Sequence, residues 1–395
     1  PHPCLVVAAL GLAAGLLRLG GWRVPADGLS RAILLLFFVL LASAALAAFY
    51  SGPVIAAGTL ARVILFGTSV YVYFYITSGP GAPEWSAART LFLAASASAL
   101  FACVDFYFQF PAPAGFGPQY VWLDSGVYRR AQGLFYEAST LGNFCAFFLV
   151  MVAVSLTRPR TEAFVSRPVL LTGGALLATA LVLSYSRASL LNLAAASAAL
   201  LWIQRRRRRL SQAGWVALPA AMATAAAAWY LFPVFTGHYW DRLSASAQFL
   251  FSSTEGVLSG RLSSWRALVD FLIANPSCAL LGVGYKTLPY SNVTGQPVVG
   301  DNMYLTLLVE TGIAGLAALL TLHGAILKAA WRAAGHADSR VSFFGTWIFC
   351  FWIGQMFQML SGDLLTYWRV LPFYFWALAV AVRAADEHSL SRSVQ

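Results

Sequence analysis

The sequence contains few charged residues. Only 10% of its 395 residues are Asp, Glu, Lys or Arg, whereas 59% are hydrophobic. A soluble domain carries about 25% charged residues, so this composition excludes an ordinary water-soluble fold. Apolar runs of about 20 residues, the length that a membrane helix needs, fill most of the chain. They predict an all-α polytopic membrane protein, whereas a β-barrel would show short alternating segments instead.

Cysteine and histidine are also scarce, at five residues each. The cysteines lie mostly inside apolar runs and form no CxxC pair, so they indicate small core residues rather than a disulfide or metal framework. No set of His, Cys and carboxylate residues has the spacing of metal ligands. We therefore predict no bound metal and no other cofactor.

The clearest topological signal is the run of arginines from Arg205 to Arg209, "RRRRR". Such a run could bind nucleic acid, but it adjoins an apolar span, and the positive-inside rule then places it in the cytoplasm. A proline at the first position suggests that the true start of the chain is missing. One helix lost before Pro1 would place both ends in the cytoplasm and raise the expected number of spans from eleven to about twelve. The eleven expected spans are 4–17, 30–50, 54–78, 88–108, 133–157, 169–186, 188–204, 214–233, 302–327, 342–360 and 368–383.

Counting the expected spans in both directions from this cytoplasmic arginine run divides the chain into three regions. Residues 1–233 hold membrane helices and a smaller external loop at about 109–132. Residues 234–301 form a large external loop, and residues 302–395 contain the last helices and a cytoplasmic tail. Most of the 26 Lys and Arg residues then face the cytoplasm, and Arg62 lies within a span. Eight cations face outward against the rule, and they carry the functional information: Arg129, Arg130, Arg187, Arg242, Arg261, Arg266, Lys286 and Arg369.

The large external loop contains a predicted surface helix in "SGRLSSWRALVDFLIANP". Ser259 can cap its start and Pro276 can end it, while its apolar residues follow helical spacing. Arg266 lies four residues before Asp270, which favours a solvated ion pair. Arg261 falls at the edge of the apolar stripe, where it could meet an anion at the membrane surface.

Two further external cations have both structural and functional interpretations. Arg187, in "LSYSRASLL", lies at the tip of a tight helical hairpin, where it is either a snorkelling anchor or, as we favour, a functional residue. Lys286 follows Gly282 and Gly284 in "GVGYK", a weak signal for a phosphate-binding loop.

Acidic residues lie close to the same boundary. Asp301 and Asn302 precede the span that contains Glu310, and Asp301 is either a helix cap or a functional carboxylate. Glu137 lies at the start of another span, where an ion pair with Arg129, Arg130 or Arg62 is favoured over catalysis.

External arginines suit a lipid-linked diphosphate, because a guanidinium binds phosphate oxygens in a bidentate manner and can stabilise a leaving group. A nearby carboxylate can accept a proton from an attacking sugar hydroxyl, and aromatic side chains can stack on sugars. The composition therefore suits metal-independent glycosyl transfer.

The order of several motifs resembles the bacterial O-antigen ligase and polymerase superfamily. The resemblance rests on "SGRLSSWRALVDFLIANPSCALLGVGYKTL" followed by "DNMYLTLLVETGIAGL", and more loosely on "RAQGLFYEASTLGNF" and "LSYSRASLL". It implies a membrane glycosyltransferase of the bacterial inner membrane, with a periplasmic active site under the large loop. It implies an undecaprenyl-diphosphate-linked glycan as donor, and it matches Arg187 and Arg261 to the family's arginines.

The ligases of this superfamily typically carry histidine before the asparagine, whereas this sequence has Asp301. The resemblance therefore favours an inverting-type polymerase of O-antigen or exopolysaccharide, with Asp301 as candidate base and a lipid-linked repeat unit as acceptor. A ligase to lipid A core, or a transferase to protein, remains the alternative. A flippase is disfavoured, because the charges gather at the outer boundary instead of lining a path. The predicted catalytic residues are Asp301, Arg187 and Arg261, and the predicted substrate-binding residues are Arg266, Lys286, Asn302, Tyr304, Arg130, Glu137 and Trp265.

Overall fold

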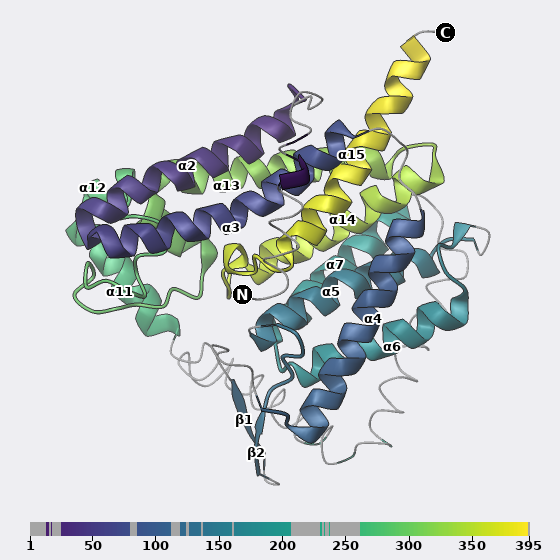
Figure 1. Ribbon diagram of the computed structural model, residues 1–395, viewed down its shortest axis with the longest axis horizontal. Helices are drawn as coiled ribbons and strands as arrows, with labels where there is room; N and C mark the ends of the chain where they lie inside the picture. Colours follow the sequence, from purple (N-terminus) through teal and green to yellow (C-terminus); the bar gives the residue numbers. More distant parts are fainter. Residues whose placement is uncertain are drawn as a thin grey trace. The chain divides into compact units, whose positions relative to one another are not determined.

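The chain is described by a computed structural model, shown in Figure 1. It describes residues 25–79, 85–111, 119–123, 126–135, 137–159, 162–206 and 261–393, together with residues 13–15, 17, 230, 233 and 237. Several predicted features lie wholly or almost wholly outside these residues: the spans 4–17 and 214–233, the external cation Arg242, the part of the large loop before Arg261, and the Ser259 cap.

The described residues form a helix at each of the remaining expected spans. In chain order these helices are α2 (Gly28–Ser51), α3 (Pro53–Ser78), α4 (Trp85–Phe108), α5 (Ala138–Leu156), α6 (Arg167–Leu183), α7 (Arg187–Arg206), α13 (Met303–Ala334), α14 (Ser339–Gln358) and α15 (Leu371–Ser393). The predicted surface helix is α11 (Arg261–Ala274), and Pro276 begins the short helix α12 (Pro276–Leu281). A 3-10 turn, η3 (Leu364–Thr366), precedes α15.

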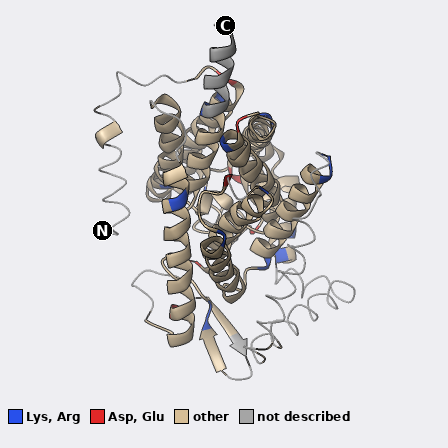
Figure 2. Cartoon of the chain, turned by 90° about the vertical axis from the view of Figure 1, so that its right-hand side faces the viewer, with Lys and Arg blue, Asp and Glu red and all other residues tan. Residues whose placement is uncertain are grey.

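The composition of these helices confirms an all-α polytopic membrane protein. Within the described residues, α2, α3, α4, α5 and α13 are long and apolar enough to cross a membrane, and α6 is a shorter apolar helix. Charged residues are sparse along the drawn helices (Figure 2). Many apolar side chains on these helices are exposed, among them Phe38, Ile64 and Leu100, which is expected of a surface that faces lipid.

The chain divides into two compact units, which are described separately. The first comprises residues 1–83, 265–352 and 359–395. In it, α3 packs against α2 and α15, while α13 packs against α2, α12 and α15. The second comprises residues 84–264 and 353–358. In it, α5 packs between α6 and α7, and α6 also contacts α4.

Two local features differ from the sequence prediction. The smaller external loop contains an antiparallel hairpin of β1 (Tyr120–Leu123) and β2 (Gly126–Arg129), where no strand was expected. The expected continuous span 302–327 is broken at Gly312, whose φ of 68° is non-helical. Glycine adopts this left-handed conformation without the steric cost that a Cβ atom would add.

Candidate active site

The predicted hairpin around Arg187 is a turn of three residues. Helix α6 ends at Leu183 and α7 begins at Arg187, and Tyr185 between them has a φ of 50°. Ser184 and Ser186 are buried, whereas Arg187 is exposed. Arg187 therefore lies at the N-terminus of α7, where the helix dipole favours an anion, although the amides of Ser186 and Ser189 already donate to serine oxygens of the turn.

Arg130 is held against the same turn. Its Nε donates to the carbonyl oxygen of Ser184 at 2.8 Å, and the amide of Ala131 donates to the carbonyl of Leu183 at 3.0 Å. These bonds use the carbonyl groups that the end of α6 leaves unpaired. Two predicted site residues, Arg130 and Arg187, are thus brought to one turn of the second unit.

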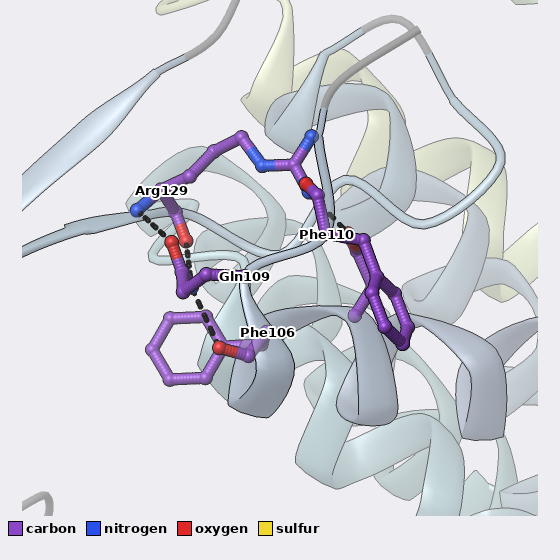
Figure 3. Close-up of polar contacts among 5 residues, drawn as sticks. Phe106, Gln109, Phe110 and Arg129 are labelled. Carbon is purple, nitrogen blue, oxygen red and sulfur yellow. Dashed lines mark hydrogen bonds and ion pairs between the residues drawn. The ribbon is translucent and has the colours of Figure 1, made fainter.

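The neighbouring Arg129 has a structural role. Its buried guanidinium binds the Asp105 carboxylate of α4 at 2.6 Å and the carbonyl of Phe110 at 2.7 Å. The side chain of Gln109 accepts from the Arg129 amide and donates to the carbonyls of Arg129 and Phe106 (Figure 3). These bonds fix the hairpin to the end of α4.

The prediction that Glu137 forms an ion pair is wrong for Arg129, because Arg129 binds Asp105 instead. Glu137 occupies the N-cap position of α5, and its carboxylate accepts from the Ser139 hydroxyl at 3.1 Å. Within the described part of the chain, its carboxylate forms no ion pair. The sequence did not single out Asp105, because an acid near the end of an apolar run shows no partner until the hairpin folds back.

In the first unit, Gly282 and Gly284 allow close backbone packing. The break at Gly312 removes helical partners from the carbonyls of Val309 and Glu310. The amides of Val283 and Gly284 replace them at 3.1 and 2.8 Å. A Cβ atom on Gly282 would collide with the Glu310 backbone. These contacts account for the glycines without a phosphate, so the structure does not support the phosphate-loop interpretation.

The loop of residues 282–288 is also fixed to α2 and α3. The hydroxyl of Thr59 donates to the carbonyl of Tyr285 at 2.6 Å, and the Tyr285 amide donates to Ser43 Oγ at 3.3 Å. A Cβ atom on Gly284 would lie 2.5 Å from the Cα of Ala47. Burial, with the Glu310 carboxylate nearby, raises the pKa of the Tyr285 phenol.

Lys286 is buried and not an exposed external cation. Its Nζ forms an ion pair with Asp363 Oδ2, while Asp363 Oδ1 accepts from the Leu365 amide at 3.1 Å. Lys286 and Arg62 also act electrostatically on Glu310. The carboxylate of Glu310 is buried beside the backbone of Lys286 and Leu288. To bind substrate as predicted, Lys286 would have to leave its ion pair with Asp363.

The start of α13 separates the roles of Asp301 and Asn302. Asn302 is the N-cap, because its Oδ1 accepts from the Leu305 amide at 3.1 Å. Asn302, and not Asp301, therefore caps this helix. Asp301 is half-buried, between the capping residue and Gly300, whose carbonyl accepts from Thr306 Oγ1 at 2.7 Å. Tyr304 lies edge-on to His323, with ring centroids 6.1 Å apart.

Helix α11 buries one side chain fully, Leu268. Arg261 at its start and Trp265 are half-buried, whereas Arg266 and Asp270 are exposed. The expected Arg266–Asp270 ion pair is absent among the ion pairs of the described residues. The indole Nε1 of Trp265 is buried without a hydrogen-bond partner there.

The predicted site residues are distributed between the two units. Arg130, Glu137 and Arg187 belong to the second unit, and Arg261 begins α11, along which the chain passes from the second unit to the first. The other predicted residues belong to the first unit: Trp265, Arg266, Lys286, Asn302, Asp301 and Tyr304. No group of three or more His, Cys, Asp or Glu residues in the described chain is arranged to hold a metal ion.

Comparison with known proteins identifies a domain in the centre of the chain. A family model described as O-antigen ligase matches residues 172–320, which include Arg187, Arg261 and Asp301. No curated protein matches the chain. The matched family supports an enzyme of the O-antigen ligase or polymerase type in a multi-pass membrane protein. Residues 172–320 of this chain are thus similar to the O-antigen ligase family, and this match supports the resemblance to the O-antigen ligase and polymerase superfamily.

Proposed function

We propose that this protein transfers a glycan from an undecaprenyl-diphosphate-linked donor to a sugar hydroxyl, with inversion at the donor carbon, and acts as an O-antigen or exopolysaccharide polymerase. One observation carries the proposal. Within the matched domain, exposed Arg187 begins α7, and Arg130 is hydrogen-bonded to the turn immediately before it. Two guanidinium groups and a helix N-terminus at one place suit a diphosphate.

In this mechanism Arg187 stabilises the leaving group. The acceptor oxygen forms a bond to the anomeric carbon of the donor sugar while the bond from that carbon to the diphosphate oxygen breaks. The bonding electrons leave with undecaprenyl diphosphate. Arg187 and Arg261 supply positive charge to the departing diphosphate, which lowers the barrier when the charge develops at positioned donors.

Asp301 is the proposed base that accepts the proton of the attacking hydroxyl. Its neighbour Asn302 supplies the helix cap, so the carboxylate of Asp301 is not needed for that purpose. Half-buried Tyr304 and Trp265 are proposed to contact sugar rings, and exposed Arg266 is proposed to contact the glycan or its phosphate. The direct attack of the acceptor on the donor carbon gives the inverted product.

The second candidate is a ligase that transfers the glycan to lipid A core. The description of the matched family, O-antigen ligase, favours it, whereas aspartate at position 301 favours the polymerase. Under either function we place the protein in the bacterial inner membrane with its active site facing the periplasm.

Reconstitution tests the proposal and separates the two candidates. Purified protein in liposomes is supplied with undecaprenyl-diphosphate-linked repeat units, with and without lipid A core, and the products are resolved by gel electrophoresis. A ladder on repeat units alone establishes the polymerase, and a product that requires core establishes the ligase. Arg187→Ala should abolish either product, while Arg332→Ala, at the far end of α13, should not. Product formation by Arg187→Ala at the wild-type rate would contradict the assignment.

A further inference from the structure

A buried cluster of amides and hydroxyls lies within the second unit, directly beside the turn that carries Arg187. Asn143 of α5 donates to Gln355 Oε1 at 2.6 Å and to Gln358 Oε1 at 2.7 Å. Asn192 of α7 donates to the same two oxygens at 3.2 and 2.9 Å. The four side chains are almost completely buried, so the cluster joins α5 and α7 to the end of α14.

The cluster continues through hydroxyl groups to the turn itself. Gln358 Nε2 donates to Ser189 Oγ at 3.2 Å. Ser189 Oγ is 2.8 Å from the hydroxyl of Ser186, the residue before Arg187. A Cβ atom on Gly142 of α5 would lie 2.8 Å from atoms of both serines. Helix α5 therefore packs against the turn more closely than a side chain at residue 142 would allow.

This polar cluster is only partly satisfied. Oδ1 of Asn192 and Nε2 of Gln355 are buried and have no hydrogen-bond partner in the described structure. A buried polar group without a partner costs free energy, and a partly satisfied network is less favourable than an apolar contact of the same shape. Amides inside membrane helices are correspondingly a sign of function.

The geometry of α7 shows what the cluster fixes. Ser186, Ser189 and Asn192 are spaced by three residues, so they lie along one face at the start of the helix. All three are buried, and Arg187, about 100° further around the axis, is exposed. Hydrogen bonds from that face to Gln358 determine the rotation of α7 about its axis and, with it, the direction of Arg187.

We infer that Gln358, with Ser189 and Asn192, is a positioning residue for Arg187 and sets its guanidinium for the diphosphate. The inference rests on the proposed function, since it takes Arg187 as the diphosphate-binding group. Gln358 is the centre of the cluster, because its side chain bonds to Asn143, Asn192 and Ser189. The action is indirect: the cluster is buried and contacts no substrate.

Binding of undecaprenyl diphosphate to the purified full-length protein in nanodiscs tests this inference. The variants are Arg187→Ala, Gln358→Leu, Ser189→Ala and the double variant of Arg187→Ala with Gln358→Leu. Ser155→Ala, a small change at the opposite end of α5, is the matched control. We expect Arg187→Ala and Gln358→Leu each to weaken binding by about tenfold or more, the equivalent of a lost charge-assisted hydrogen bond. The double variant should bind no more weakly than Arg187→Ala alone.

The thermal unfolding midpoint separates positioning from general damage. Should Gln358→Leu fail to fold, Ser189→Ala provides the test, because it removes one hydroxyl and leaves the amides in place. The inference would be overturned if Gln358→Leu, or a folded Ser189→Ala, bound undecaprenyl diphosphate as tightly as the wild type while Arg187→Ala bound it weakly. The inference would also be overturned if the losses of binding free energy in the two single variants added up in the double variant. Such additivity would show that Gln358 acts independently of Arg187. If the wild type does not bind, or Arg187→Ala binds normally, the proposed function fails first and this inference fails with it.

Discussion

The amide of Gly284 donates to the carbonyl of Glu310 at 2.8 Å, where α13 is broken. This bond, with that from Val283 to Val309, replaces helical bonds lost at Gly312. The loop 282–288 and the first turns of α13 are therefore one folded unit. Asp301, at the start of those turns, depends on it for its position.

Gly312→Ala should consequently destabilise the protein strongly. Alanine at a φ of 68° and a ψ of −170° costs about 1–3 kcal/mol, and its Cβ would collide with the carbonyl of Leu280. We expect a lower thermal unfolding midpoint in detergent and loss of transfer. Gly324→Ala is the matched control in the same helix, because a Cβ there meets nothing within 4 Å. Equal midpoints for the two variants would show that the break is not required.

The buried pair of Lys286 and Asp363 leads to a second prediction. Removing one partner of a buried ion pair costs about 3–5 kcal/mol, because the other charge remains unpaired. Lys286→Met alone should therefore lower the unfolding midpoint strongly, and adding Asp363→Leu should restore part of the loss. Lys328→Met, at an exposed position of α13, is the control. If Lys286→Met instead keeps its midpoint and loses donor binding, Lys286 binds substrate as first predicted.

Much of the fold was accessible from the sequence, because apolar length alone defines a membrane helix. The helix ends and the loop helix also followed from local signals, as at Pro276. The break at Gly312 and the pairing of Lys286 with Asp363 were not accessible, since both depend on segments far apart in the chain. The same holds for Gln355 and Gln358, which in an apolar run gave no sign of their partners on α5 and α7.

The hairpin anchor gives a third prediction. Arg129→Lys keeps the charge but cannot bind Asp105 and the Phe110 carbonyl with one planar group. We expect faster proteolysis of the loop 109–132 and weaker donor binding, since Arg130 follows Arg129 directly and contacts the Arg187 turn. Arg89→Lys, at an exposed position of α4, should behave like the wild type. Unchanged proteolysis in Arg129→Lys would show that Gln109 alone holds the hairpin.

The last prediction separates the two residues that precede α13. Asp301→Asn keeps the shape of the side chain and removes the carboxylate, so it should reduce turnover by about 100-fold or more if Asp301 is the general base, with the unfolding midpoint unchanged. Asn302→Ala should lower stability by about 1 kcal/mol through loss of the cap bond from the Leu305 amide, and Asn302→Asp should restore it. Turnover in liposomes and thermal unfolding are measured on the same preparations. Normal turnover by Asp301→Asn would remove it from the catalytic residues and leave the proton of the attacking hydroxyl to another acceptor.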